Sequence, residues 1–190
     1  MNTELLSAIY NVDRVADSLK FYIRELDDSC ENLRKKLLQE IVIKPNLQFS
    51  EELQPRALTK YIFFHHRAGC GSVESLHDLH LSHGWAGVGY HLYVDLKGKI
   101  HQGRPLGVIG AHCYGWNRYS IGICFEGDYT KIQKMPDKQF EAGLRAVQIC
   151  RTAREGWDDL QVLGHKDKYN TKCPGNYFPL NTFKSLLNKV

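Results

Sequence analysis

Long apolar runs and a disulfide framework are both missing from this chain of 190 residues. No stretch approaches the roughly 18 consecutive apolar residues that a membrane-spanning helix needs. The first residues, MNTELLSAIYNVDR, lack a basic start followed by an unbroken apolar segment, so no secretory signal is expected. Six cysteines are too few for a disulfide scaffold, and reduced thiols are the default. We therefore expect a protein made in the cytoplasm, without a membrane span.

The composition also excludes disorder and low complexity. With 43% hydrophobic and 24% charged residues, the chain can bury one sizeable core and carry a small appendage. Residues 1–56 carry 8 basic and 10 acidic side chains, whereas residues 57–190 carry 17 and 11. This balance suits an anionic partner, although many solvated surfaces look the same. A nucleic-acid partner is not expected, because a basic helix or a stripe of mixed aromatic and basic side chains is missing.

Glycine and proline are absent from residues 3–40, and apolar side chains recur there at alternating spacings of four and three. This heptad pattern predicts a coiled-coil-like helix, or a helical hairpin if Asp27-Asp28-Ser29 interrupts it. Either form must bury its apolar seam, by self-association into a homodimer, which we prefer, or by packing on the rest of the chain. The seam consists of Leu5, Ile9, Val12, Ala16, Leu19, Ile23, Leu26, Cys30, Leu33 and Leu37.

Strand and helix patterns alternate in the second part of the chain. Strands are expected at 61–66, 89–96, 99–103, 120–127 and 160–165, and helices at 73–84, 136–156 and 181–190. The turn at Lys97-Gly98 predicts a hairpin, and hence one antiparallel pair. We expect an α/β fold with a central mixed sheet flanked by helices. The predicted organisation is an N-terminal helical region (1–42), a proline-containing linker (43–58) and a catalytic domain (59–190).

Histidines follow two of the predicted strands, and a cysteine lies in a nearby polar loop. His65 and His66 end the segment YIFFHH, His165 ends LQVLGH, and Cys173 comes eight residues later. Two imidazoles and one thiolate would form a zinc site with three protein ligands, which leaves the fourth position open as catalytic zinc requires.

A second group of histidines competes with this site. His77, His80 and His83 are spaced three apart in a predicted helix. That spacing carries the third imidazole away from the face of the first, so we interpret the group as a polar helix face with one or two packed rings.

Four segments occur in the order of the motifs of a known enzyme family. They are FFHHRAG (63–69), GWAGVGYHLYVDLKGKI (84–100), GAHCYGWNRYSIGICFEG (110–127) and LGHKDKYNTKCPG (163–175). Together they resemble the zinc N-acetylmuramoyl-L-alanine amidases, whose fold is shared with peptidoglycan recognition proteins and phage lysozyme-type amidases. The resemblance runs from about residue 60 to 179 and leaves out the N-terminal helical region.

The resemblance implies a role for each matching residue. One zinc ion per chain would be held by His65, His165 and Cys173. Tyr90 corresponds to the family residue near the metal water, and Thr171 to a residue that assists catalysis. The candidate substrate-binding residues are His66, which could instead only pack against the ligand, His112, Asn117, and Trp116, whose ring could stack on a sugar or anchor its loop.

The chemistry of these groups fits the implied roles. Tyr90 can orient a water molecule, although its ordinary pKa near 10 disfavours proton abstraction; it could also be an ordinary strand aromatic. Thr171, or a backbone amide of the CPG turn, could stabilise an oxyanion. Alternatively, the Thr171 hydroxyl could only close its own turn.

The resemblance predicts a peptidoglycan hydrolase that cleaves the amide bond between N-acetylmuramic acid and L-alanine, with a phage or prophage endolysin released to the wall by a partner pore as its context. One alternative is a non-catalytic peptidoglycan-binding module of the same fold. Another is an intracellular muropeptide-recycling amidase, which typically has Asp where this chain has Cys173. A third is an interaction protein built around the N-terminal helix.

Two features depart from the family pattern. Cys70 has no partner for the disulfide of animal recognition proteins, and Pro105 and Leu106 depart from the residues that relatives use for stem-peptide specificity.

Overall fold

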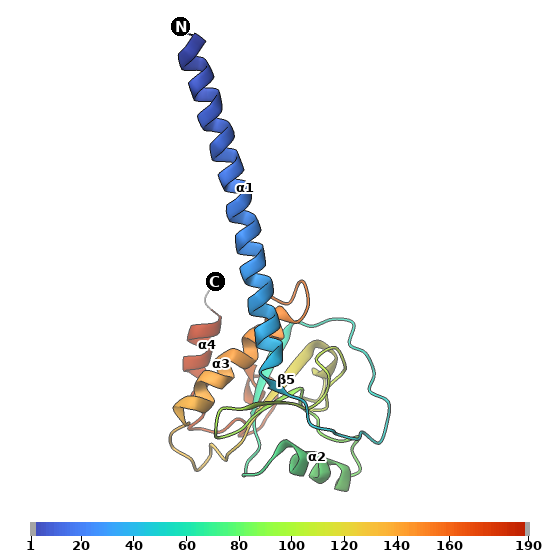
Figure 1. Cartoon of the computed structure of the whole chain (residues 1–190). Coiled ribbons are helices and arrows are strands. Elements are labelled where there is room, and N and C mark those ends of the chain that lie inside the picture. The colour runs from blue at the N-terminus through green and yellow to red at the C-terminus, as the bar shows by residue number, and fades with distance from the viewer. Residues whose placement is uncertain (1–2, 189–190) are drawn as a thin grey trace. The chain divides into compact units, whose positions relative to one another are not determined.

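The computed structural model describes residues 3–188, with side chains from Arg14 onward. The chain divides into two compact units, Met1–Leu37 and Leu38–Val190, each of which is described by itself. Figure 1 shows the elements of both units along the chain.

Helix α1 (Thr3–Glu40) forms the first unit and runs on into the start of the second. It is continuous through Asp27-Asp28-Ser29, so the helical hairpin is wrong and the single helix is confirmed. Residues of modest helix propensity cost only tenths of a kcal/mol each, too little to break a helix of this length. Leu5, Ile9 and Val12 lie outside the described side chains. The more than half-exposed seam residues are Leu19, Ile23, Leu26, Leu33 and Leu37.

A six-stranded sheet is the centre of the second unit. Its strands are β1 (Val42–Ile43), β2 (Tyr61–His66), β3 (Leu92–Val94), β4 (Ile100–Gln102), β5 (Ser120–Phe125) and β6 (Gln161–Gly164). Their order is β1-β4-β3-β5-β2-β6, and β3–β4 is the antiparallel pair among parallel ones. The predicted mixed sheet and its hairpin are therefore confirmed.

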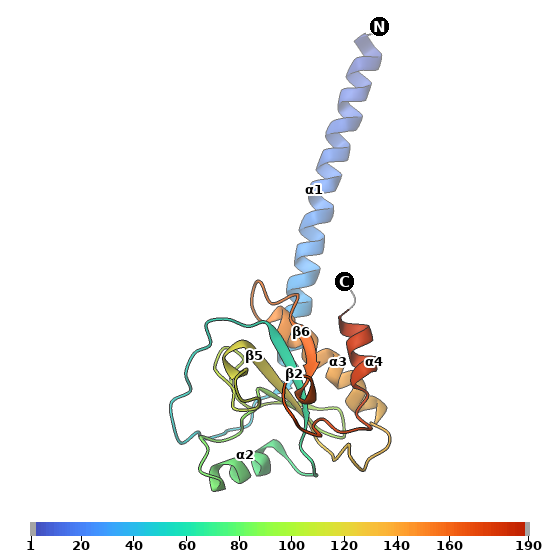
Figure 2. The same cartoon turned by 180° about the vertical axis from the view of Figure 1, so that it is seen from behind.

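Helices cover both faces of this sheet (Figures 1 and 2). On one face α3 (Asp137–Thr152) and α4 (Leu180–Leu187) bury the main core, in which Phe64 packs edge to face against Phe125 and against Phe183. On the other face lies α2 (Val73–Ser82), whose first turn is capped by Ser72. Because side chains alternate along β2, His65 points to the α2 side of the sheet and His66 to the side of α3 and α4.

The segment predicted as a linker is an integral part of the second unit. Val42 and Ile43 pair with β4, and Arg56 is buried. Its guanidinium donates hydrogen bonds to the carbonyls of Leu106, Val108 and Ser120, which satisfies a charge that burial would otherwise penalise. The compact unit therefore begins near residue 38, and the predicted boundaries at 42/43 and 58/59 are corrected accordingly.

None of the helices within residues 3–188 combines the length and the apolar character that crossing a bilayer requires.

Candidate metal centre

Two neighbouring parallel strands bring His65 and His165 together. In the β2–β6 register, Phe64 is opposite Gly164, so the next residues of both strands, His65 and His165, meet at the same carboxyl edge. The β6 strand ends at Gly164 and turns into a short 3-10 helix, η2 (His165–Asp167). The ring centroids of the two histidines are 4.6 Å apart. Carboxyl ends of parallel strands are where α/β folds commonly place ligands.

The loop after η2 supplies the third side chain, Cys173. The backbone N–H of Lys166 donates to the Cys173 carbonyl at 3.0 Å, and the N–H of Cys173 donates to Thr171 Oγ1 at 3.2 Å. The backbone N–H of His66 points at Cys173 Sγ from 3.4 Å. These contacts fasten the loop to the end of β2 and hold the sulfur beside the first histidine.

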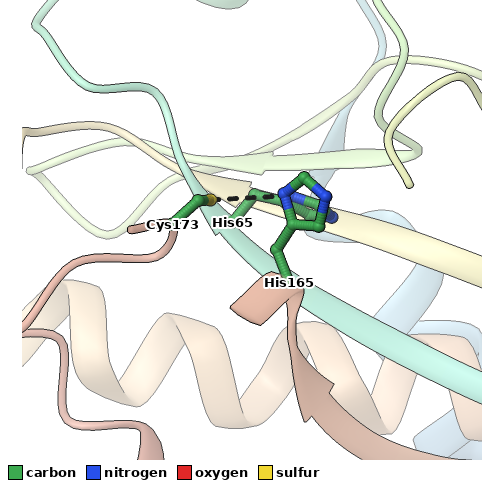
Figure 3. Close-up of side chains that lie close together, drawn as sticks. All are labelled: His65, His165 and Cys173. Carbon is green, nitrogen blue, oxygen red and sulfur yellow. Dashed lines mark hydrogen bonds between the residues drawn. The ribbon is translucent and has the colours of Figure 1, made fainter. Parts of the chain in front are cut away.

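The three side chains converge, as Figure 3 shows. The ligand atoms of His65, His165 and Cys173 all lie within 4.8 Å of one another, and Sγ is 3.7 Å from His65 Nδ1. In the described part of the chain no other set of His, Cys, Asp or Glu side chains gathers in this way. Two imidazole nitrogens and a sulfur at these separations match the donors and size of a zinc site.

His112 lies behind the first of these residues. Nε2 of His65 is 3.1 Å from Nδ1 of His112, while Nδ1 of His65 faces the sulfur. His112 is buried, and Gly122 makes room for it, because a Cβ at position 122 would lie 2.6 Å from the imidazole. His112 therefore contacts His65 from behind, and its predicted contact with substrate stays a prediction.

Tyr90 is next to the same histidine, with ring centroids 5.0 Å apart. Two histidines of α2 position its chain segment: Nδ1 of His77 accepts the N–H of Val88 at 3.2 Å, and Nδ1 of His80 accepts the N–H of Gly89 at 3.1 Å. Burial raises the pKa of the Tyr90 phenol well above its usual value. Tyr90 is therefore a neutral phenol, which can donate a hydrogen bond.

The competing histidine group does not converge on a metal. His77 and His80 are packed against the segment before Tyr90, and His83 is exposed. The interpretation as a helix face with packed rings therefore fits the structure.

The remaining predicted site residues lie around the three donors without touching a common point. Thr171 accepts the N–H of Cys173, which is the turn-closing alternative. Asn117 Oδ1 accepts the N–H groups of His112 and Cys113, both at 2.9 Å, and so shapes the loop that carries His112. The Trp116 ring is covered on one face by the Lys168 ammonium, 4.7 Å from its centroid.

His66, the remaining predicted substrate contact, is buried on the opposite side of the sheet. Its Nδ1 accepts the N–H of Tyr129 at 3.0 Å. The strand alternation that aims His65 at the donors turns its neighbour to the other side of the sheet, and substrate contact by His66 stays a prediction. His66 stabilises the turn at Asp128 and Tyr129.

Burial sets the protonation of the three donors. Desolvation lowers the pKa of His65, helped by the nearby His112 and His165, and burial also lowers the pKa of His165. Burial raises the pKa of the Cys173 thiol to about 12, although the His66 N–H opposes this shift. Without a cation the site holds two neutral imidazoles and a thiol, and a divalent metal would displace the thiol proton.

Sequence reasoning missed the residues that brace this arrangement. His91 is buried, accepts the N–H of Gly122 on Nδ1 at 2.9 Å and donates from Nε2 to the Val108 carbonyl at 3.0 Å. Arg56 lies beside it and holds the same loop. A histidine just before a strand and an arginine directly after Pro55 carry no spacing that would have identified them.

The same fold and motifs occur in known proteins. A family profile described as N-acetylmuramoyl-L-alanine amidase matches residues 54–176. The chain is 36% identical over 128 residues to the endolysin of Enterobacteria phage T3, covering 65% of this chain and 85% of that protein. It is 30% identical over 125 residues to peptidoglycan-recognition protein SC2 of Drosophila melanogaster, covering 60% and 67%.

Among solved structures, an endolysin amidase, LysCS from Clostridium intestinale, superposes with a TM-score of 0.71 at 27% identity, covering 78% of this chain and 96% of that one. The ectodomain complex of peptidoglycan recognition proteins LCa and LCx, solved with tracheal cytotoxin, gives a TM-score of 0.68 at 27% identity, covering 75% and 94%.

Proposed function

Because the chain belongs to the N-acetylmuramoyl-L-alanine amidase family, we propose that it is a zinc-dependent peptidoglycan hydrolase that cleaves the amide bond between N-acetylmuramic acid and the L-alanine of the stem peptide. The observation that carries this proposal is the convergence of His65, His165 and Cys173 on one point. A peptidoglycan-binding protein without catalysis has no need of three zinc donors with an open fourth position.

The donor set fits zinc in its orientation as well as its composition. His65 presents Nδ1 to the site and can donate its Nε2–H to His112, which fixes its tautomer. The His66 N–H stabilises negative charge on Cys173 Sγ. When bound here, zinc would polarise the scissile carbonyl and lower the pKa of a water molecule.

The protein groups around the three donors stabilise the charge that develops on the substrate and hold the donors in place. Tyr90 is a neutral phenol beside His65, so its part is to donate a hydrogen bond to the carbonyl oxygen as negative charge develops there. The Thr171 hydroxyl accepts the backbone N–H of Cys173 and thereby holds the thiol-bearing residue in place. The buried His112 covers the Nε2 side of His65 and so keeps water away from it, and the buried His91 packs against His112.

The biological setting we propose is lysis by a phage or prophage endolysin that acts on the wall after release from the cytoplasm. Similarity to the phage T3 endolysin and to the Clostridium intestinale amidase supports this setting. The second candidate is a peptidoglycan receptor without hydrolysis, which the likeness to the recognition proteins supports.

Zinc content and bond cleavage separate the two candidates. The full chain should bind one zinc ion and release a new L-alanine amino terminus from a defined muropeptide. Cys173→Ser should lose zinc and turnover while keeping the circular dichroism of the folded chain. His83→Ala, which changes an exposed histidine outside the site, is the matched control and should keep both. Muropeptide binding with zinc present and no amine released would instead establish the receptor.

A further inference from the structure

We propose that two copies of this chain pair through the α1 seam in an antiparallel arrangement. Charged residues beside the seam select the register of the two helices. The apolar seam alone indicates a partner of some kind. The charges that flank the seam indicate a second α1 helix, because they complement those of another copy in one orientation.

Heptad positions can be read directly from the seam. With Ile23 and Cys30 at position a and Leu19, Leu26 and Leu33 at position d, the residue after each d is an e position. Those e residues are Lys20, Asp27 and Arg34, preceded in the sequence by Asp13. The charges therefore alternate in sign along one flank of the seam.

In an antiparallel pair, e positions of one helix lie next to e positions of the other. A pair centred between residues 24 and 25 places Lys20 beside Asp27 of the second copy, and Asp27 beside Lys20 of that copy. A shift by one heptad in one direction brings Lys20 next to Arg34 and Asp27 next to Asp27, and a shift in the other direction brings Lys20 next to Lys20. The alternation therefore disfavours the neighbouring registers.

The sizes of the seam residues favour the same register. It sets Cys30 opposite Leu19 of the second copy, Ala16 opposite Leu33, and Ile23 opposite Leu26, so each small side chain meets a large one. A parallel, in-register pair would instead stack Ala16 on Ala16 and Cys30 on Cys30, which leaves gaps in a seam of otherwise large residues. It would also leave the flanking charges unpaired, with Lys20 beside Val15 and Asp27 beside Tyr22.

The contacts that α1 makes by itself do not satisfy these features. Among the side chains that the structure describes, Lys20 pairs with the exposed Asp17 at 3.1 Å and Arg34 with Glu31 at 3.9 Å. Such pairs contribute little on a solvated helix. Leu19, Ile23 and Leu26 are each more than half exposed. Cys30 is exposed as well.

A charge reversal in the full chain tests the proposal by sedimentation equilibrium at low salt. Lys20→Glu alone and Asp27→Lys alone should each weaken the dimer about fivefold to tenfold, because each change creates two like-charge contacts. The double variant should restore the wild-type dissociation constant. Matched controls are Lys35→Glu and Asp28→Lys, which alter charges on the outward f positions and should leave association unchanged.

Thiol cross-linking gives an independent measurement of orientation in a Cys70→Ser background, which removes the other exposed thiol. Mild oxidation should leave Cys30 unlinked, and the added substitution Leu19→Cys should produce disulfide-linked dimers. A Cys30–Cys30 disulfide in the chain without Leu19→Cys would establish a parallel pair. A chain that stays monomeric at all concentrations, or a dimer indifferent to both charge reversals, would overturn the proposal. None of these outcomes depends on hydrolysis.

Discussion

The imidazoles of His65 and His112 face each other across 3.1 Å, Nε2 to Nδ1, on the side of His65 away from Cys173. His65 thus turns one nitrogen toward Cys173 and the other toward a buried partner, for which Gly122 leaves the space. A ligand held from behind in this way keeps its ring plane and tautomer when the metal leaves. The site is therefore arranged by the fold before any cation binds.

Removing His112 should loosen this arrangement. His112→Ala is expected to weaken zinc binding about 10-fold to 100-fold, because His65 loses the acceptor that orients it. His112→Asn, which offers an oxygen acceptor, should recover part of the loss. Zinc affinity is measured by competition with a chromophoric chelator, and His83→Ala serves as control. Equal affinity in the wild type and His112→Ala would show that His65 needs no such support.

Zinc binding should release about one proton per ion near neutral pH. The lowered pKa values of His65 and His165 mean that both rings are already neutral, whereas the Cys173 thiol, with a pKa raised to about 12, must lose its proton. The apparent affinity should therefore rise about tenfold per pH unit between about pH 7 and 9. Calorimetry in buffers of different ionisation enthalpy counts the protons; release unchanged in Cys173→Ser would assign them elsewhere.

Tyr90→Phe should lower kcat and leave zinc binding intact. Burial raises the pKa of its phenol, so we expect Tyr90 to act as a hydrogen-bond donor and not as a base. Loss of one such donor to a developing oxyanion reduces turnover about a hundredfold. Steady-state kinetics on a soluble muropeptide should show the loss in kcat with little change in KM. A wild-type rate that climbs steeply toward pH 10 and beyond would point to a phenolate base instead.

Acid should destabilise the zinc-free protein in a defined range. Burial lowers the folded-state pKa of His80 to about 4 and of His112 to about 3, while unfolded histidine titrates near 6.5. Below about pH 6.5 these histidines therefore bind protons in the unfolded chain but not in the folded chain, and the free energy of unfolding falls as the pH drops toward about 4. Above about pH 6.5 the two histidines cause no such loss of stability.

Urea unfolding with a chelator, at a series of pH values across this range, measures the slope. His80→Gln keeps an acceptor for the Gly89 N–H but removes a titrating group, so its slope should be shallower than that of the wild type. His83→Ala should retain the full slope. Stability that does not change between pH 7.5 and 5 would mean that the buried histidines are protonated in the folded state.

The alternation of strands and helices is readable from the sequence because apolar periodicity is local. YIFFHH, SIGICF and QVLG form β2, β5 and β6, and Ser72 caps α2 as its position indicates. The convergence of His65, His165 and Cys173 can be anticipated because ordered motifs carry it. The segment after Glu40 is not a linker, although its prolines indicate a loop. A loop can still be buried, and Arg56 is held by carbonyls at least 50 residues away.

Roles that depend on which way a side chain points are the least predictable. His112 is expected at the substrate and lies against the Nε2 side of His65, and His66 points to the other side of the sheet from its neighbour. Sequence spacing locates a residue along the chain but does not say which loop folds over it. The heptad pattern likewise locates the apolar seam within α1, whereas only the charges beside the seam indicate which helix pairs with it.

The most direct test is a crystal structure of the zinc-loaded full chain at the zinc absorption edge, paired with hydrolysis by the same preparation. We predict one anomalous peak bonded to Nδ1 of His65, an imidazole nitrogen of His165 and Sγ of Cys173, together with release of L-alanine amino termini. Zinc bound elsewhere, with these three side chains unligated in an active enzyme, would contradict the account.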